Sequence, residues 1–190
     1  MSWLGLAALM ALTAGATFLT LGYALFLGIG PLPTSRKVAR EVVQLLPADM
    51  KRFYELGSGI GAMALLVARQ RPSCEVIACE LSPVPYLISK LRKALGSYPN
   101  LTLTREDIFT LPLASESLLF CYLYPGAMEK LKERLTTHDS PPLSILTHTF
   151  AIHGWSPSKV VYATDLYRTP IYLYQTHQGQ TQPSSTISTL

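Results

Sequence analysis

Three glycines at alternate positions constrain the fold of this chain more than any other feature. Gly57, Gly59 and Gly61 follow residues 51–56, which are expected to form a strand, and precede a helical pattern over residues 62–70. Glycine lets the backbone turn sharply and approach a ligand at a distance that a Cβ atom would prevent. A strand that enters a helix through such a loop is where an open α/β sheet binds its ligand. The sequence therefore predicts an α/β domain with its site at the carboxyl end of this strand.

Strand and helix patterns alternate along the rest of the domain. Beside the elements already named, a helix that Thr34 or Ser35 caps and Pro47 ends comes first, and further helices are expected over 83–95 and 126–135. Strands are expected over 75–79, 101–104, 117–123, 144–150, 159–164 and 169–174. The segment 106–116 is too short for a crossover helix. The predicted fold class is α/β: a doubly wound, mostly parallel, Rossmann-like sheet with a C-terminal antiparallel hairpin.

The first 35 residues carry no charged side chain, and residues 3–29 are apolar except for small and hydroxyl residues. A hydrocarbon layer of ~30 Å needs about 20 helical residues, so this run predicts one transmembrane helix in contact with the lipid bilayer. A cleaved signal peptide is the alternative, but it normally has a basic start and a shorter apolar run. We therefore divide the chain into an anchor over 1–30, a folded domain over 31–176 and a polar, disordered tail over 177–190.

Basic residues follow this segment, and none precedes it. Arg36, Lys37 and Arg40 place the domain on the cytoplasmic face of an inner membrane by the positive-inside rule, or on the matrix face of the mitochondrial inner membrane in a eukaryote. The net charge of +4 is spread along the chain, which argues against a nucleic-acid partner. The cysteines and histidines lack metal-ligand spacing, so no metal is expected.

The glycine loop by itself fits two cofactors. Gly57-x-Gly59-x-x-Ala62 satisfies the dinucleotide fingerprint, with Glu80 placed to hold a ribose. Against a dinucleotide stands Glu55, whose carboxylate would repel a pyrophosphate but would suit the ammonium of an amino acid. A helix also precedes the first strand, whereas many dinucleotide domains begin at that strand. After the third strand, Asp107 and the amide of Ile108 are placed to recognise an adenine edge.

These residues resemble the successive cofactor motifs of class I S-adenosylmethionine-dependent methyltransferases. The match runs over about residues 50–125 and is carried by Glu55–Gly61, Glu80 and Glu106-Asp107. The resemblance implies S-adenosyl-L-methionine as the cofactor. It implies the following cofactor-binding residues: Glu55, Gly57, Ser58, Gly59, Gly61, Glu80, Leu81, Asp107 and Ile108.

One subfamily is similar over a longer stretch: the membrane-anchored protein lysine methyltransferases that modify the ATP synthase c-subunit and the adenine nucleotide translocase. Pro33-Thr34 matches the start of its pre-domain helix, residues 118–135 its strand, Pro-containing turn and helix, and residues 150–157 its His-Trp-x-Pro element. This chain departs by Glu at position 55, a glycine between His153 and Trp155, and the short 106–116 connection. The resemblance implies N-methylation of a lysine in a membrane-embedded or membrane-associated protein.

Tyr124 is the candidate catalytic residue. It lies at the carboxyl end of the fourth strand, where its hydroxyl or its ring is placed to orient an amine. The run from Tyr122 to Pro125 lacks the Asp or Asn and paired prolines of base-modifying enzymes, which disfavours a nucleic-acid substrate. Three alternatives stay open: a nicotinamide-dependent membrane-bound oxidoreductase, a methyltransferase of a small molecule or lipid, and a non-catalytic interaction module.

Overall fold

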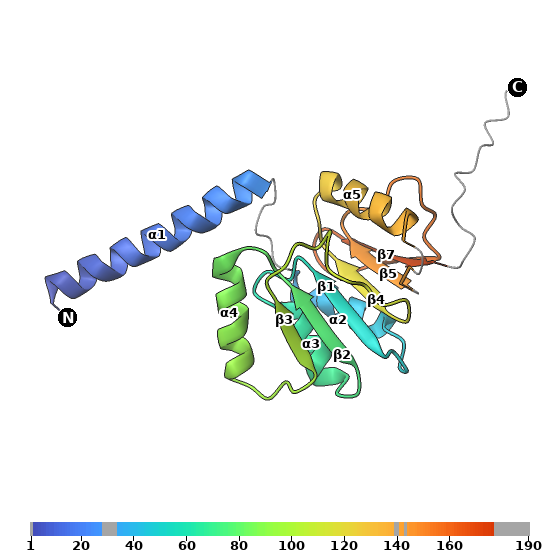
Figure 1. Ribbon diagram of the computed structural model, residues 1–190, viewed down its shortest axis with the longest axis horizontal. Coiled ribbons are helices and arrows are strands. Elements are labelled where there is room, and N and C mark those ends of the chain that lie inside the picture. The colour runs from blue at the N-terminus through green and yellow to red at the C-terminus, as the bar shows by residue number, and fades with distance from the viewer. Residues whose placement is uncertain (1, 28–33, 139–140, 143, 177–190) are drawn as a thin grey trace, which may run out of the picture.

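The predicted strands assemble into one seven-stranded sheet with helices on both faces (Figure 1). The computed structural model describes residues 2–27, 34–138, 141–142 and 144–176. The helices are α1 (Trp3–Leu27), α2 (Arg36–Leu45), α3 (Ala62–Gln70), α4 (Pro83–Ala94) and α5 (Pro125–Thr136). The strands are β1 (Arg52–Leu56), β2 (Glu75–Cys79), β3 (Leu101–Thr104), β4 (Leu118–Cys121), β5 (Ser144–His148), β6 (Lys159–Tyr162) and β7 (Pro170–Gln175).

The strand order places the glycine loop at the middle of the sheet. The order is β3-β2-β1-β4-β5-β7-β6, with β7 antiparallel to β5 and β6 and the other pairs parallel. The chain moves outward from β1 in one direction and returns to β4 for the other, so the order reverses between these two strands. Such a switch point is where open α/β sheets bind ligands. The α/β prediction and the closing antiparallel hairpin are confirmed.

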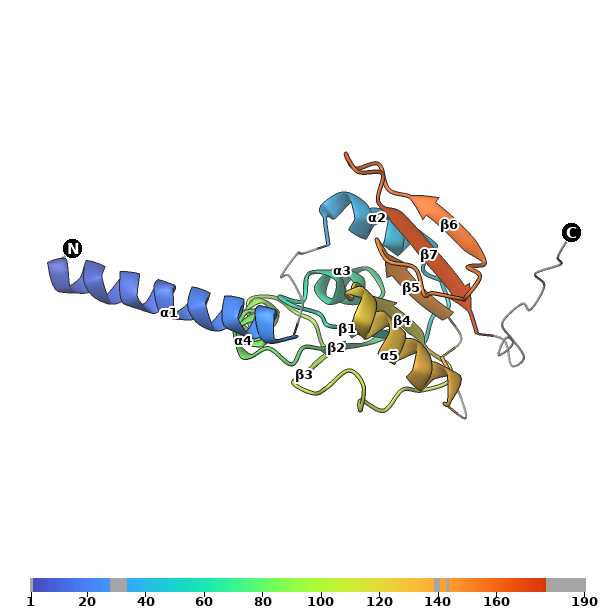
Figure 2. The same cartoon turned by 90° about the horizontal axis from the view of Figure 1, so that it is seen from above.

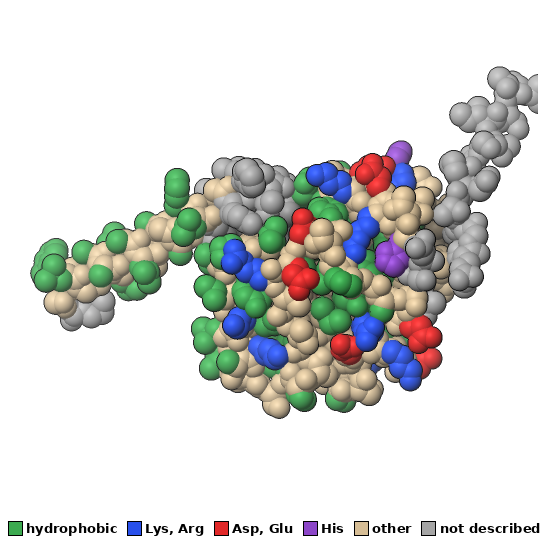
Figure 3. Space-filling view, viewed as in Figure 1, with side chains coloured by type: hydrophobic (Ala, Val, Ile, Leu, Met, Phe, Trp, Pro, Cys, Tyr) green, Lys and Arg blue, Asp and Glu red, His purple; other side chains and the backbone are tan. Residues whose placement is uncertain are grey.

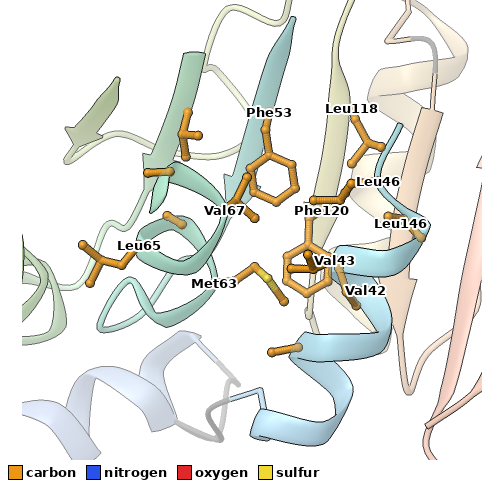
Figure 4. Packing of buried hydrophobic residues seen from close by; sticks show 14 of the residues in the cluster. Val42, Val43, Leu46, Phe53, Met63, Leu65, Val67, Leu118, Phe120 and Leu146 are labelled. Atoms are coloured by element: carbon orange, nitrogen blue, oxygen red, sulfur yellow. The ribbon is translucent and has the colours of Figure 1, made fainter. Parts of the chain in front are cut away.

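Two apolar layers hold the helices against the sheet. Phe53 and Phe120, from neighbouring strands, face α2 and α3 and are 0% and 1% exposed (Figure 4). Tyr54 follows Phe53 and Leu119 precedes Phe120, and these two residues pair across β1 and β4. Both pack in the opposite layer, with the buried residues of α5. Side chains alternate between faces along a strand, so near-continuous apolar runs are what a sheet covered on both sides requires.

Helix α3 and strands β2 and β3 have the bounds that the patterns predict. Strand β4 ends at Cys121 instead of residue 123, because the chain leaves the sheet toward Pro125, the first residue of α5. Strand β5 ends at His148 instead of residue 150. There Thr149 adopts φ +68°, outside the extended region that a strand needs.

Helix α1 extends away from the domain (Figures 1 and 2). Trp3, Leu12 and Phe18 are 91%, 74% and 78% exposed. The structure describes the side chains of α1 at residues 3–19 and 22. Within the described residues, no helix has both the length and the hydropathy that a membrane span requires. The transmembrane helix predicted over 3–29, part of which lies outside that description, is therefore not confirmed. The predicted tail over 177–190 also lies outside the described residues.

Candidate functional site

The loop after β1 takes the left-handed backbone that its glycines allow. Gly57, Gly59 and Gly61 have φ of +72°, +54° and +71°, which side chains with a Cβ rarely adopt. The amides of Gly57 and Ser58 both donate to the carbonyl of Cys79 at the end of β2, at 2.9 Å. These bonds attach the turn to the neighbouring strand, so the loop is held open at the carboxyl edge of the sheet.

The three glycines differ in what surrounds them. A Cβ atom at Gly57 would lie 3.1 Å from the Leu123 side chain, and one at Gly61 would lie 3.1 Å from Cβ of Ser89 in α4. A Cβ atom at Gly59 would meet nothing within 4 Å. A Cβ atom would therefore be crowded at Gly57 and Gly61, whereas Gly59 faces open space of the kind a bound ligand fills.

Glu80 ties the loop to the start of α4. One carboxylate oxygen accepts from the amide of Gly59 at 2.8 Å, and the other accepts from the amide of Ser82 at 2.7 Å. Each carboxylate oxygen has a second lone pair, so Glu80 keeps acceptor capacity for a ligand hydroxyl. The strand-end position predicted for this acid places it beside the open side of the glycine loop.

Glu55 is buried beneath the loop, with 6% of its surface exposed. Its carboxylate accepts from the amide of Ala64 in the first turn of α3 at 2.7 Å. Burial, and to a smaller extent the charge of Glu80, raise the pKa of Glu55 to about 8, against the lowering effects of the Ala64 amide and of the charge of Arg92. A buried carboxylate here is poorly compensated without a cation.

The third predicted motif forms a turn after β3. The Asp107 carboxylate accepts from the amide of Phe109 at 2.9 Å, and the side chain is exposed. Arg134 of α5 donates to the carbonyls of Ile108 and Leu111, which fastens this turn to the domain. The Cys79 thiol, at the end of β2, donates to the carbonyl of Glu106 at 3.0 Å. These contacts bring the turn to the same sheet edge as Glu80.

The carboxyl ends of β4 and β5 carry an aromatic stack. The ring of His148 lies 4.1 Å from that of Tyr122 and 5.7 Å from that of Phe120, and Tyr122 also stacks on Phe150 at 6.3 Å. Tyr124 caps the start of α5, and its ring covers Gly126, where a Cβ atom would lie 2.9 Å from the ring. Tyr122 and Tyr124 thus lie at the edge predicted for them.

His148 is a site residue that the sequence did not single out. It is 3% exposed, with Nε2 3.0 Å from the hydroxyl of Thr34 and Nδ1 3.1 Å from that of Thr149. Burial lowers its pKa to about 4, although the charge of Asp165 opposes the shift. The strained backbone of Thr149 follows directly, and strain of this kind is concentrated at functional sites.

Comparison with known proteins identifies this arrangement. The family model described as the ANTKMT methyltransferase domain matches residues 55–159, which include the glycine loop, Glu80, Asp107 and the aromatic stack. The chain belongs to this family. It is a class I S-adenosylmethionine-dependent methyltransferase, as its motifs predict. The nicotinamide-dependent oxidoreductase and the non-catalytic module are set aside by this finding.

Two relatives of the methyltransferase span most of its domain. A protein-lysine N-methyltransferase of Saccharolobus islandicus (strain REY15A) is 22% identical over 141 residues, which cover 70% of this chain and 84% of that protein. The crystal structure of an RNA methyltransferase from Salinibacter ruber, in complex with S-adenosyl-L-homocysteine, has 26% identity and a TM-score of 0.65, and covers 76% of this chain and 93% of that one. Release factor glutamine methyltransferase of Escherichia coli (strain K12) is 29% identical over 80 residues, 42% of this chain and 29% of its own length.

The residues of the loop fit an S-adenosylmethionine molecule. Ser58 is 7% exposed, and its hydroxyl has no hydrogen-bond partner among the described residues. Gly59 leaves its side of the loop open, and Glu80 has lone pairs to spare. A buried polar atom without a partner is expensive, so a ligand group beside Ser58 would remove that cost. The predicted roles of the individual cofactor-binding residues stay predictions.

The raised pKa of Glu55 predicts a pH dependence of binding. If its carboxylate meets the cofactor's ammonium, the complex favours the ionised form, and Glu55 must release its proton on binding below a pH of about 8. The affinity of the methyltransferase for S-adenosylhomocysteine is expected to rise with pH from about 6 to about 8, by up to about tenfold per pH unit. Titration calorimetry in buffers of different ionisation enthalpy measures both the affinity and the proton release.

Glu55→Gln is the matched variant, because its amide oxygen still accepts from Ala64 while the charge is lost. We expect weaker binding without the Glu55-dependent proton release. Equal proton release in the variant and the wild type would show that another group titrates and would remove Glu55 from this role.

The lowered pKa of His148 predicts a second pH dependence, that of stability. An unfolded histidine takes up a proton near pH 6.5, whereas the folded one does so only near 4, so its contribution is present above about 6.5 and is lost as the pH falls toward 4. Over this window the wild type should lose on the order of 2 kcal/mol more of its free energy of unfolding than His148→Phe, which keeps the stacking. Urea unfolding at several pH values measures the difference. His153→Phe, at an exposed position, is the control and should follow the wild type.

Proposed function

We propose that this methyltransferase transfers the methyl group of S-adenosylmethionine to a lysine side chain of a protein in or at a membrane. The observation that carries the proposal is the Thr34–His148 contact. Thr34 is the first described residue after α1, and it bonds to His148 beside Tyr122 at the carboxyl edge of the sheet. After the apolar N-terminal segment, the chain therefore enters the domain at the edge of the sheet that also carries the glycine loop. The protein-lysine relative from Saccharolobus islandicus supports the acceptor class.

Each cofactor group has a candidate partner at this edge. Glu80 would accept from the ribose hydroxyls, Glu55 would meet the ammonium, and Asp107 with the Ile108 amide would hold the adenine. The bound cofactor supplies a methyl group on a sulfonium, an activated leaving group. The protein has to position the acceptor in line with that methyl group and keep water away from it.

A lysine acceptor must lose a proton before it attacks. Its ordinary pKa is about 10.4, and an apolar, aromatic environment lowers that value because it penalises the charged form. Tyr122, Phe150 and Tyr124 supply aromatic walls at the sheet edge, and Tyr124 is the residue we propose to orient the amine. His148, whose pKa of about 4 keeps it neutral, positions Tyr122 by stacking and does not hold the proton.

We also propose that α1 inserts into a lipid bilayer and that residues 31–176 form the catalytic domain on its cytoplasmic or matrix side. The support is the composition of the helix, which has no charged residue, and the exposure of its large side chains, such as Leu4 at 83%. A helix with apolar residues on all sides suits a lipid environment better than a groove in one partner. The basic residues of α2 agree with the positive-inside rule.

The test is to incubate host membranes and cytosol with tritiated S-adenosylmethionine and the full-length methyltransferase. The expected result is a labelled protein band from the membrane fraction that yields methyllysine on hydrolysis, and no band with Glu80→Ala. Label in RNA, in lipid or in a small molecule would overturn the lysine assignment. RNA is included because the similar Salinibacter ruber protein is an RNA methyltransferase. Recovery of the unlabelled enzyme in the soluble fraction would overturn the anchor.

A further inference from the structure

Helix α4 exposes an apolar stripe that the fold does not use. Leu87, Ile88, Leu91 and Leu95 are 61%, 41%, 61% and 81% exposed. They recur at spacings of three and four residues, so they share one side of the helix. The opposite side packs on the domain, where Ser89 is 1% exposed beside Gly61. The stripe is therefore the outward face of a helix that is anchored to the sheet.

Basic side chains flank this stripe. Lys90 and Arg92 lie on either side of it at helical spacing, and Lys90 lies over the ring of Tyr86, with Nζ 5.8 Å from the ring centroid. Figure 3 shows lysine and arginine side chains next to apolar ones on the part of the surface that α4 forms. An apolar stripe with basic borders is the pattern of a helix that lies in the plane of an anionic membrane surface.

The position of α1 matches this orientation. Helix α1 contacts α4 and leaves the domain on the side of α4, and α4 runs crosswise to α1 in Figure 1 and is seen nearly end-on in Figure 2. If α1 enters a bilayer along its own axis, the membrane plane lies along α4. The outward stripe of α4 then faces the lipid headgroups.

We propose that α4 is an interfacial membrane-binding helix, with Leu87, Leu91 and Leu95 in the headgroup region of an anionic bilayer and Lys90 and Arg92 on its phosphates. This inference rests on the proposed insertion of α1. Arg92 donates to the carbonyl of Ile60 in the glycine loop at 2.6 Å. Docking of α4 would therefore hold the glycine loop directly at the membrane surface. A methyl acceptor close to the bilayer is then within reach of the site.

The experiment labels full-length protein with an environment-sensitive fluorophore at single introduced cysteines. The three native cysteines are buried, which leaves the new thiols to react. Leu91→Cys reports on α4, Leu4→Cys on α1, and Ser115→Cys, in an exposed loop, is the matched control. The protein is reconstituted with phosphatidylcholine vesicles that contain phosphatidylglycerol and brominated acyl chains, and quenching by bromine is measured.

Quenching at positions 91 and 4 but not at 115 supports the proposal. Quenching at position 4 alone overturns it and leaves the anchor intact, whereas quenching at 91 alone supports α4 docking and refutes insertion of α1. No quenching at either position overturns both. If the fluorescence of the label at position 91 changes with protein concentration and not with lipid, the stripe binds a second copy of the chain and the proposal is overturned.

The charge of Lys90 gives an independent readout. One basic residue near an anionic surface contributes ~1 kcal/mol, so Lys90→Gln should reduce the quenching-derived association of α4 with phosphatidylglycerol vesicles by about fivefold. Lys159→Gln, at an exposed position of β6, is the control and should leave that association unchanged. Equal association of the wild type and Lys90→Gln would show that the basic border has no part in the docking.

Discussion

Gly59→Ala is expected to lower the affinity of the methyltransferase for S-adenosylhomocysteine by about a hundredfold while the protein stays folded. The added Cβ meets no protein atom within 4 Å, so packing does not oppose it. It does occupy the open space on the loop, and it forces an alanine into a backbone with φ of +54°, which costs about 1–2 kcal/mol. Calorimetric titration and thermal unfolding of the same sample separate the two effects.

Gly61→Ala is the matched control for this prediction. Its φ of +71° imposes similar strain, but its Cβ would lie 3.1 Å from Cβ of Ser89, so we expect the larger loss of stability. The two variants should therefore differ in kind: Gly59→Ala affects binding more than stability, and Gly61→Ala affects stability more. Wild-type affinity in a folded Gly59→Ala protein would show that the cofactor does not occupy this side of the loop.

The order of elements could be predicted because burial on both sheet faces leaves a clear record in sequence. Strand β2 appears as a short apolar run between Glu75 and Glu80, and β3 as an alternation of Leu and Thr. The glycine loop fixes where β1 leads into α3. The ends of β4 and β5 could not be predicted, because the residues after Cys121 and His148 are as apolar and aromatic as the strands themselves. Only the backbone turn at Thr149, φ +68°, shows where β5 stops.

The same reasoning explains which site residues were predictable. Glu80 follows directly on the predicted strand 75–79, and Asp107 comes three residues after the predicted strand 101–104, so parallel pairing brings both toward one edge of the sheet. Asp107 also makes the local bond to the Phe109 amide that is typical of an Asp in a turn, so its position was predictable for two reasons.

His148 could not be predicted, since its partner Thr34 lies 114 residues away and no local spacing connects them. One signal was present. His148 closes the strand Ser144–His148, in which the preceding three residues, Ile145, Leu146 and Thr147, are fully buried, and a histidine at the end of such a strand has to find polar partners.

Glu80→Ala is expected to weaken S-adenosylhomocysteine binding by about a hundredfold, or ~2.7 kcal/mol. The carboxylate accepts from the amides of Gly59 and Ser82, and bonds to a charged acceptor contribute about 1.5–3 kcal/mol each. Its removal therefore loosens the loop and also deletes the proposed ribose acceptor. Calorimetry measures the affinity, and loss of methyl transfer should follow it.

Glu75→Ala is the control, because Glu75 lies at the other end of β2 in an exposed ion pair with Arg52. Such pairs contribute little to stability, and this one is remote from the carboxyl edge of the sheet, so binding should be unchanged. Glu80→Gln separates the two effects of Glu80. The amides of Gly59 and Ser82 donate to different carboxylate oxygens, and Gln replaces one of these oxygens by an NH2 group that cannot accept. One of the two bonds is therefore lost, and we expect an affinity between those of the wild type and Glu80→Ala. If both Glu80 variants bind as the wild type does, Glu80 has no role in the cofactor site, and the acidic residue at the end of β2 only closes the turn into α4.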